Sequence, residues 1–453
     1  MFFRQILHED LGCASYVVAS GGEAVVVDPK WEIDEYLGIA AEADAKILHV
    51  LETHFHADHV SGRRKLMRAT GAKPHLPLDP QRPKSRGLRD GDSLSIGSVQ
   101  LTVIATPGHR PEHIAFLLSE AGAPTLLLSG DSLLIGALAR PDLAVDAVEG
   151  ARALWATVKR LTSLGESVEV WPAHVGASLC GSGALTERTH STIGEELRSN
   201  SQLSLPDEDS FVQELTRTTP ARPARVSQVV TFNLDGSEEP NPVRQLDRGG
   251  LAEMIAAGAC VLDVRSPDLF DQCHIDRALN LPAGRRSLGN RAGWATRPDE
   301  LIVVVSQTRD SGERVTSLLR AAGVWNVVGA TVADPDAWVA DGLPVSSSRA
   351  LVPAELPALL STGEMQLVDV RDQGEWHSGH VAGSVHLPLH RLGDGSQALA
   401  ATQRPLAVAC AAGARAALAA SILRRRGHSE VWRVSGGVPD LAGRGVPLIA
   451  GDR

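Results

Sequence analysis

The amino-acid sequence predicts an α/β protein built from more than one domain. The chain has 453 residues, whereas a single hydrophobic core rarely serves more than ~300 residues. Two segments of the C-terminal half repeat one another, and in both repeats short apolar runs typical of strands alternate with helical segments. That alternation is typical of a parallel sheet covered by helices.

The composition is that of an ordinary globular protein, with 43% hydrophobic and 22% charged residues. No apolar run approaches the ~20 residues that cross a bilayer. Arg4, Glu9 and Asp10 interrupt the N-terminal stretch where a secretory signal needs an apolar core. The five cysteines are scattered and odd in number, as expected of reduced thiols. We therefore expect a cytoplasmic protein without a membrane partner.

The net charge of -10 disfavours nucleic acid as a partner, because a phosphate backbone would be repelled. The chain has only two Tyr and seven Phe, and no basic stretch is interleaved with aromatic residues. We expect small-molecule partners, and a homo-oligomer is compatible with the sequence.

The two repeats align over most of their length. Residues 262–282 (LDVRSPDLFDQCHIDRALNLP) match residues 368–388 (VDVRDQGEWHSGHVAGSVHLP) at an offset of 106, and the match continues downstream at an offset of 104. Each repeat has about 100 residues, the size of a small domain. Residues 219–242, before the repeats, are rich in turn-forming residues. We therefore predict three domains, at residues 1–240, 246–347 and 350–453.

In the N-terminal region, four predicted strands each end in a polar signature. Residues 47–51 precede THFHADH, 101–105 precede TPGH, 125–128 precede SGD and 168–171 precede PAH. Imidazole and carboxylate groups are ligands suited to zinc and iron, and a sheet that aligns these strand ends would gather them. The sequence therefore predicts a metal site drawn from seven side chains: His54, His56, Asp58, His59, His109, Asp131 and His174.

Other histidines and cysteines lack such company. His8, His113 and His190 have no neighbouring signature, and we expect them to be ordinary solvated residues. Cys260 and Cys273 are expected to pack in cores, since a free cysteine is often a small buried hydrophobe.

The run from Thr53 to His59 (THxHxDH), with the later His109, Asp131 and His174, resembles the signature of the metallo-β-lactamase fold. The resemblance covers roughly residues 1–235 and implies an αββα sandwich with the metal site at one edge of its two sheets. Residues 129–142 (SGDSLLIGALARPD), 172–181 (PAHVGASLCG) and 191–196 (STIGEE) look like the persulfide dioxygenase branch of that superfamily.

Carried over by this resemblance, one Fe(II) per chain would be held by His54, His109 and Asp131, with open positions for a persulfide sulfur and O2. The other four signature residues would orient the ligands and hold water, or bind a second metal as matching residues do in the hydrolase branches. Arg140 falls where the family places an arginine that lines the substrate channel; an ordinary surface arginine is the alternative. The family's glycine-rich context is Ala137-Leu138-Ala139 here.

Two cysteines of the same domain lie on predicted loops. Cys13 precedes the metal signatures, and Cys180 follows His174 by six positions. Fused members of the family carry cysteines at such places. Contact with a sulfur substrate and simple packing both stay open for these two residues.

In the second repeat, a predicted strand at residues 406–409 ends at Cys410, and a loop leads straight into a helix. Backbone N–H groups of such a loop lower the pKa of a thiol and stabilise a persulfide or a bound oxyanion. Gly413 allows the tight loop, and Arg415 adds positive charge. The pattern CxxGxR, with DVR at 369–371 and GHVAGSVHLP at 379–388, resembles the rhodanese family. The resemblance implies sulfur transfer through Cys410.

The first repeat has Ser306, Arg309 and Ser311 at the positions of that cysteine, glycine and arginine. A serine hydroxyl has a far higher pKa than a thiol and cannot carry sulfane sulfur. The sequence therefore predicts two rhodanese-like α/β domains, of which the first is inactive.

Together the resemblances imply an enzyme of sulfide detoxification. Iron would oxidise a low-molecular-weight thiol persulfide, such as glutathione persulfide, with O2 to sulfite, while the rhodanese domain handles thiosulfate or persulfide. The alternative is a dinuclear zinc thioester hydrolase of glyoxalase II type with an appended sulfurtransferase, because candidate ligands for two metals are present. A third hypothesis is a non-catalytic role, in which the rhodanese domains carry sulfur or dock another protein.

Overall fold

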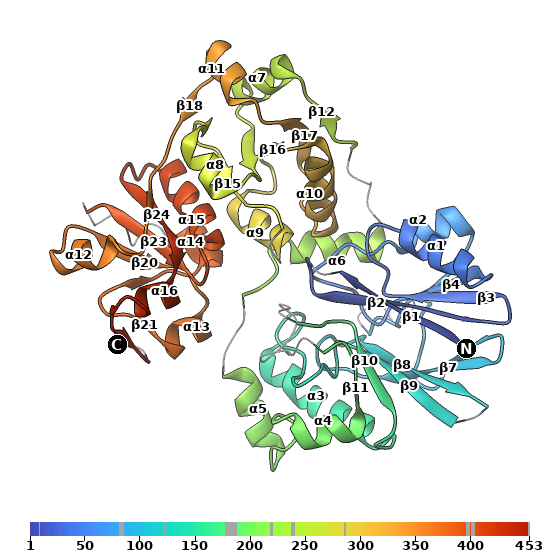
Figure 1. The fold of residues 1–453 in the computed structure, drawn as a ribbon. Helices are drawn as coiled ribbons and strands as arrows, with labels where there is room; N and C mark the ends of the chain where they lie inside the picture. The colour runs from blue at the N-terminus through green and yellow to red at the C-terminus, as the bar shows by residue number, and fades with distance from the viewer. Residues whose placement is uncertain are drawn as a thin grey trace. The chain divides into compact units, whose positions relative to one another are not determined.

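The computed structural model describes residues 1–8, 10–80, 86–121, 123–176, 188–217, 221–236, 241–284, 287–395, 399 and 404–451. The chain forms two compact units, one made of residues up to 238 and the other of almost all residues from 239 onward (Figure 1). Each unit is described by itself below. Among the described helices, none combines the length and the apolar character that crossing a bilayer requires.

The first unit is built on two sheets. The first sheet runs in chain order, β1 (Phe2–His8), β2 (Cys13–Ser20), β3 (Glu23–Val27), β4 (Lys46–Leu51) and β5 (Lys73–His75). The second runs in reverse chain order, β11 (Ser191–Thr192), β10 (Glu169–Pro172), β9 (Ala123–Gly130), β8 (Ile114–Glu120), β7 (Val99–Ala105) and β6 (Ser93–Ile96). Both sheets mix parallel and antiparallel pairs.

Helices cover the outer face of each sheet, as the strand pattern requires. Successive side chains of a strand point to opposite faces, so in β2 Val18 packs between the sheets while Val17 packs with the helices outside. The outer layers contain α1 (Asp34–Glu42) and α2 (Arg63–Thr70) on one side, and α3 (Ala147–Thr162), α4 (Ile193–Ser199) and α5 (Glu208–Thr216) on the other. A further helix, α6 (Val226–Asp235), is the last element of the unit along the chain. The predicted αββα sandwich is confirmed.

All four predicted strands that precede a polar signature are present, as β4, β7, β9 and β10. The helix that follows the first signature, α2, begins at Arg63 and has Gly62 as its N-cap. The irregular stretch between β4 and α2 contains the whole HxHxDH run.

The second unit contains the two repeats, which have the same topology. The first sheet has the order β12 (Arg244–Gln245), β17 (Val327–Val332), β16 (Ile302–Ser306), β13 (Cys260–Asp263) and β15 (Leu279–Asn280). The second has the order β19 (Ala350–Leu351), β24 (Val431–Gly437), β23 (Leu406–Cys410), β20 (Gln366–Asp369) and β22 (Val385–His386). All strand pairs in both sheets are parallel, as predicted.

Helices flank each of these sheets. The first repeat has α7 (Arg248–Ala256), α8 (Pro267–Gln272), α9 (Leu288–Ala295), α10 (Arg309–Ala321) and α11 (Pro335–Ala340). The second has α12 (Leu356–Ser361), α13 (Gln373–Ser378), the 3-10 turn η1 (Leu389–Arg391), α14 (Leu392–Gly395), α15 (Ala414–Arg425) and α16 (Val438–Ala442). Two short ribbons, β14 (His274–Ile275) with β18 (Val345–Ser346) and β21 (His380–Val381) with β25 (Leu448–Ile449), complete the repeats.

The two repeats share one hydrophobic core. Leu279 and Ala292 of the first repeat belong to the same buried cluster as Leu418 and Ile422 of the second. Arg433 of β24 also pairs with Asp271 of α8 at 2.6 Å. The first repeat is thus packed against α15, the helix that follows the Cys410 loop.

Candidate metal centre and sulfur-transfer loop

Three of the predicted metal ligands converge in the first unit. Nε2 of His109 lies 3.4 Å from Oδ2 of Asp131, and Nε2 of His54 lies 3.8 Å from the same oxygen. All three side chains are 0–1% exposed. These three atoms have no hydrogen-bond partner in the described part of the chain. Because buried polar atoms are normally paired, three unpaired acceptors facing one point indicate a cation site.

Hydrogen bonds set both imidazoles in the form that binds a metal. Nδ1 of His109 donates to the carbonyl oxygen of Arg140 at 3.0 Å. The hydroxyl of Thr53 donates to Asp28, and its oxygen can therefore accept from Nδ1 of His54 at 3.0 Å. In both rings the proton sits on Nδ1, so Nε2 keeps a lone pair that points toward Asp131.

The electrostatics of the site match this arrangement. Burial lowers the pKa of His109, and burial together with the neighbouring imidazoles lowers the pKa of His54 well below its usual value. Burial would raise the pKa of Asp131, but the adjacent His174 outweighs that effect and holds the pKa below its usual range. Two neutral imidazoles and one carboxylate, a set that suits iron or zinc, are therefore available together.

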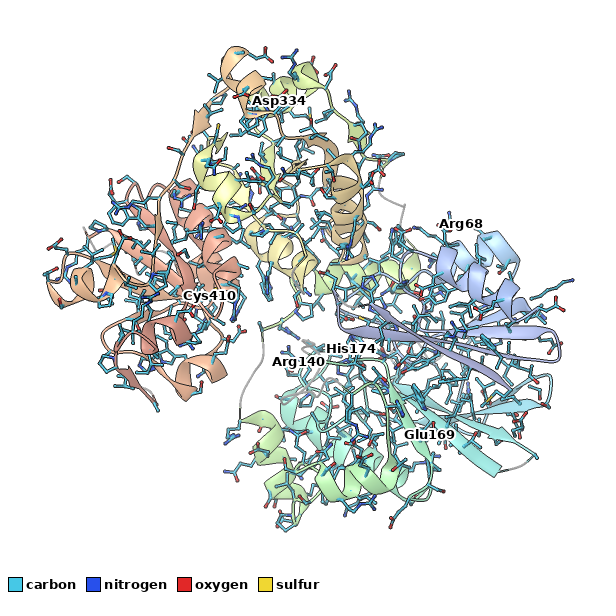
Figure 2. The ribbon with its side chains drawn as sticks, in the orientation of Figure 1. Arg68, Arg140, Glu169, His174, Asp334 and Cys410 are labelled. Carbon is cyan, nitrogen blue, oxygen red and sulfur yellow. The ribbon has the colours of Figure 1, made fainter. Side chains whose placement is uncertain are left out.

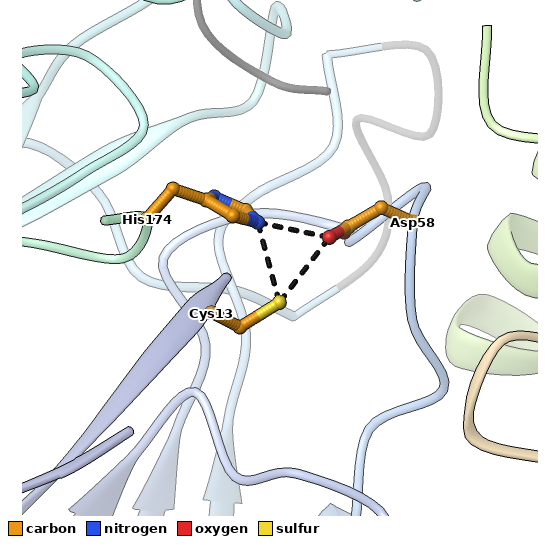
Figure 3. A group of neighbouring side chains, drawn as sticks. All are labelled: Cys13, Asp58 and His174. Atoms are coloured by element: carbon orange, nitrogen blue, oxygen red, sulfur yellow. Dashed lines mark hydrogen bonds and ion pairs between the residues drawn. The ribbon is translucent and has the colours of Figure 1, made fainter. Parts of the chain in front are cut away.

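A second group of possible ligands consists of Cys13, Asp58 and His174 (Figure 3). His174 connects the two groups, since its Nδ1 is 2.5 Å from Oδ1 of Asp131 and its Nε2 is 2.8 Å from Oδ2 of Asp58. Sγ of Cys13 lies 3.3 Å from both Asp58 Oδ2 and His174 Nε2, and 3.6 Å from Nδ1 of His59. Cys13, Asp58 and His174 could together hold a metal ion, as could His56, Asp58 and His59.

The seven predicted residues are thus brought together, and three supporting carboxylates were missed. Asp28 accepts from the backbone N–H of Thr53 at 2.7 Å and lies 3.1 Å from Nε2 of His56. Glu52 lies 3.2 Å from the same imidazole nitrogen, and Glu112 accepts from the backbone N–H of Phe55. Asp28 directly follows β3. The strand-end signal that located the other carboxylates could therefore have found it.

Asn233 of α6 is a further residue that sequence reasoning missed. Its side-chain amide donates to the carbonyl oxygens of His56 and His59 at 3.0 and 2.9 Å, and its Oδ1 accepts from the backbone N–H of Ser61 at 3.0 Å. One buried side chain therefore holds three backbone groups of the metal loop. Nothing in the local sequence around Asn233 indicates this long-range contact.

The expectation that His113 is a solvated residue was wrong. His113 is 1% exposed, and its Nε2 accepts a hydrogen bond of 2.9 Å from the backbone N–H of Asp131. Burial lowers the pKa of His113 to about 3, so the ring stays neutral and can accept that bond. His113 therefore supports the strand end that presents Asp131. His190 is exposed and stacks on Trp171, and His8 is partly buried.

Arg140 does not lie on the surface. Its side chain is fully buried, and its Nε and Nη2 donate to the two carboxylate oxygens of Asp142 at 2.7 Å each. Nη1 donates to the carbonyl oxygen of Ala221 at 2.7 Å. Figure 2 labels Arg140 and His174 in the first unit. A contact between Arg140 and substrate would have to compete with these bonds and stays a prediction. Cys180 lies outside the described residues.

The Cys410 loop has the predicted form. β23 ends at Cys410 and α15 begins at Ala414 (Figure 2). Gly413 has a φ of +86°, and its N–H donates to the Cys410 sulfur at 3.0 Å. Arg415 forms a bidentate pair with Glu375 at 2.6 and 2.7 Å and also contacts Asp372. Cys410 is 1% exposed, so its sulfur is almost completely shielded from solvent.

The corresponding loop of the first repeat is built differently. α10 begins at Arg309, three residues after Ser306, whereas α15 begins four residues after Cys410. The Ser306 hydroxyl donates to the carbonyl oxygen of Thr308 at 2.8 Å, and the Thr308 hydroxyl accepts from the N–H of Ser311. Arg309, which corresponds to Gly413 of the second repeat, is therefore already part of the helix, whereas Gly413 belongs to the loop around the Cys410 sulfur. This loop therefore lacks both a thiol and a cradle for one.

Comparison with known families agrees with both halves of this description. Residues 8–174 match the metallo-beta-lactamase superfamily, and residues 247–339 and 352–443 each match the rhodanese-like domain. The chain joins a metallo-β-lactamase-superfamily domain to two rhodanese-like domains.

Individual relatives point to more than one activity. The chain is 34% identical over 160 residues to hydroxyacylglutathione hydrolase of Cereibacter sphaeroides, covering 34% of this chain but only 59% of the hydrolase. It is 28% identical over 225 residues to the mitochondrial persulfide dioxygenase ETHE1 of Bos taurus, covering 47% of this chain and 78% of that protein.

Among solved structures, a metallo-beta-lactamase from Staphylococcus aureus matches 73% of this chain and 98% of its own, with 27% identity and a TM-score of 0.65. That match extends beyond the first unit, which has about half of the residues.

Proposed function

We propose that this protein is an iron-dependent persulfide dioxygenase with an attached sulfurtransferase. A low-molecular-weight thiol persulfide, O2 and water would give the free thiol, sulfite and two protons. The observation that carries the proposal is the set of three unpaired atoms on His54, His109 and Asp131. Two imidazoles and one carboxylate at one point are the ligand set of non-haem Fe(II) oxygenases. Such an ion would supply open positions at which a persulfide sulfur and O2 react.

The hydrogen-bond pattern favours one metal. Asp131 offers only Oδ2 to the three-ligand point, because its Oδ1 is bonded to His174. The second ring nitrogen of His174 is bonded to Asp58, so this imidazole is already shared by two carboxylates. In this arrangement the protein's part is positioning: His174 fixes the carboxylate, and Thr53 and the Arg140 carbonyl fix the two imidazoles.

Cys410 carries the second proposed activity. Its thiolate would attack the outer sulfur of thiosulfate, so that a new S–S bond forms and sulfite leaves with the electron pair of the broken bond. The N–H of Gly413 would stabilise the sulfur anion in this step. A second thiolate would then take the outer sulfur from the Cys410 persulfide. Sulfite produced by the first activity can accept that sulfur as well.

A dinuclear zinc thioester hydrolase is the second candidate. The observation that favours it is the group of Cys13, Asp58 and His174, whose ligand atoms lie within 4.8 Å of one another. Thiolate, carboxylate and imidazole are all zinc ligands. The hydroxyacylglutathione hydrolases among the relatives support this reading. In the dioxygenase proposal, Cys13 instead contacts the sulfur substrate or packs the site.

One preparation can separate the two candidates. The protein is loaded with iron without air, its metal content is measured, and O2 uptake and sulfite are followed after addition of glutathione persulfide. Hydrolysis of S-lactoylglutathione is assayed in the same preparation and after zinc loading. We expect one iron per chain, O2 uptake and sulfite. Two zinc ions per chain with thioester cleavage and no O2 uptake would overturn the proposal.

A further inference from the structure

Two elements of the second repeat border the Cys410 loop, and both are attached to the first repeat. One is α15, whose first residue follows Gly413 directly. The other is β24, whose last residue, Gly437, pairs with Cys410. A Cβ atom at Gly437 would lie 1.8 Å from the carbonyl oxygen of Ala411, so the end of β24 is in close contact with the loop. The shape of the loop therefore depends on where α15 and β24 lie.

A buried hydroxyl connects α15 to the first repeat. Ser421 of α15 is 2% exposed, and its Oγ accepts from the backbone N–H of Asn280, the last residue of β15, at 3.0 Å. The side chain of Asn280 in turn donates to the carbonyl oxygens of Asp263 and Arg265 at 3.1 Å each. A buried N–H group is costly to leave unpaired. This bond therefore fixes α15 against the end of β15.

A guanidinium holds the last residue of the same helix. Arg425 donates through Nη1 to Sγ of Cys260 at 2.9 Å, and through Nη2 to Oε1 of Glu300. Both partners belong to the first repeat, and both are buried. Loss of one member of such a pair leaves the other charge buried and unpaired. Ser421 and Arg425 are four residues apart, so they attach one face of α15 to the first repeat.

A second guanidinium attaches β24 to the first repeat. The side chain of Arg433 is 5% exposed. It donates through Nε to Oδ2 of Asp271 at 2.6 Å and through Nη2 to Oδ1 of Asp268. Both carboxylates lie on α8 of the first repeat. Arg433 is four residues before Gly437 in the same strand. The wall that β24 forms beside the Cys410 loop is thus held from the first repeat as well.

We propose that the first repeat is a positioning domain for sulfur transfer, with Ser421, Arg425 and Arg433 as the positioning residues of the second repeat. This inference rests on the proposed sulfur transfer at Cys410. The three residues fix α15 and β24, and these two elements keep the N–H of Gly413 at the Cys410 sulfur. None of the three has to touch the substrate. The repeat without a nucleophile thereby contributes to the reaction of the repeat that has one.

The kinetic test follows sulfur transfer from thiosulfate to cyanide, which gives sulfite and thiocyanate. Ser421→Val removes the acceptor of the Asn280 N–H and should lower kcat by about 10-fold, with little change in KM, because the nucleophile is misplaced while the donor still binds. Ser421→Thr keeps the hydroxyl and should keep kcat near the wild-type value. Arg433→Gln should lower kcat through β24, which keeps the test valid if Ser421→Val is poorly folded.

Leu356→Ala is the control for lost stability. Leu356 of α12 is fully buried, and among the described residues its hydrophobic cluster contains members of the second repeat alone. The substitution should lower the urea midpoint of unfolding at least as far as Ser421→Val does, but kcat of the folded protein should stay at the wild-type value. An equal fall in kcat in the two variants would mean that sulfur transfer follows global stability, and the inference would be overturned.

Hydrogen exchange of the peptide that contains residues 410–417 is a readout that needs no activity. Its amides should exchange faster in Ser421→Val and Arg433→Gln, whereas Leu356→Ala should leave this peptide at the wild-type rate. Exchange and kcat that both stay unchanged in the two interface variants would contradict a positioning role. A wild type that transfers no sulfur, but in which exchange of the loop depends on Ser421, would refute the sulfurtransferase and leave the positioning of the loop standing.

Discussion

Asp131 and His174 are joined by a hydrogen bond of 2.5 Å between Oδ1 and Nδ1, while the other oxygen of Asp131 has no partner among the described residues. This bond fixes the rotation of the carboxylate. Oδ2 is consequently presented to the Nε2 atoms of His54 and His109. One oxygen of Asp131 is thus bonded to His174 and the other is left for a metal ion. The role of His174 can be tested through this difference.

His174→Gln should weaken iron binding by about 10- to 100-fold without abolishing it, because it removes an orienting partner and leaves the three ligands. His54→Ala should abolish binding, since it removes a ligand. Competition with a chelator of known affinity measures both effects. If His174→Gln removed one of two bound metals at full stoichiometry, the residue would be a ligand of a second metal.

The two proposed activities should be separable by single substitutions. His54→Ala should remove O2 uptake and keep sulfur transfer from thiosulfate. Cys410→Ser should keep O2 uptake and lose sulfur transfer by several orders of magnitude, because a serine hydroxyl does not carry sulfane sulfur. Both assays are run on each variant. Loss of both activities in Cys410→Ser would contradict independent sites.

Ser306→Cys should not create a second sulfur-transfer site. In a Cys410→Ser background, the new thiol would lie at the end of β16, but α10 begins three residues later and no glycine curls the loop around it. Sulfur transfer should stay at the level of the background. Recovery to a tenth of wild-type activity or more would show that the thiol alone is sufficient and that the loop geometry is not required.

Asn233→Ala should weaken both the fold and the metal site. It leaves two buried carbonyl groups and one N–H group of the metal loop without their partner, at a cost of about 1–3 kcal/mol per buried group that stays unpaired. Asn200→Ala is a matched control, since Asn200 is equally buried and bonds Glu196 and Gln202. Urea denaturation should show both variants destabilised. Metal affinity should fall only in Asn233→Ala, and an equal fall in both would point to a global effect.

The stability of the second unit should depend on Cys260 at alkaline pH. Burial raises the pKa of this thiol to about 12, although the nearby Arg425 acts to lower it. In the unfolded chain the thiol ionises near pH 8.5. The folded state therefore holds the extra proton between these values, and its stability falls as pH rises through that window, by about 1.4 kcal/mol per pH unit.

Comparison of the wild type with Cys260→Ala isolates this contribution. The free energy of unfolding is measured between pH 8 and pH 10.5 for both proteins. The wild-type slope should be steeper than that of Cys260→Ala, and Cys273→Ala, altered at a half-buried cysteine of the same repeat, should keep the wild-type slope. Equal slopes in the wild type and Cys260→Ala would contradict a buried neutral thiol.

Local sequence patterns predicted much of this protein. The repeated segments predicted two parallel sheets covered by helices, because the pattern of each strand and helix is contained in a short stretch of sequence. The strand-end signatures predicted that seven side chains would converge, and they do lie close together at the candidate metal site, since aligned strands bring their ends together. The loop after Cys410 was readable for the same reason, as Gly413 and Arg415 lie within five residues of the sulfur.

Only the tertiary structure decided the contacts between distant segments. His113, predicted to be solvated, is buried, and its ring accepts a hydrogen bond from the backbone N–H of Asp131. Arg140 could have been a surface arginine as judged from the sequence. Its side chain is instead fully buried and bonds to Asp142 and to the carbonyl oxygen of Ala221. Asn233 reaches the metal loop from more than 170 residues away. The sequence by itself determined which candidate ligands and which candidate nucleophile are present. Their hydrogen-bond partners come from packing between distant segments, which no local pattern records.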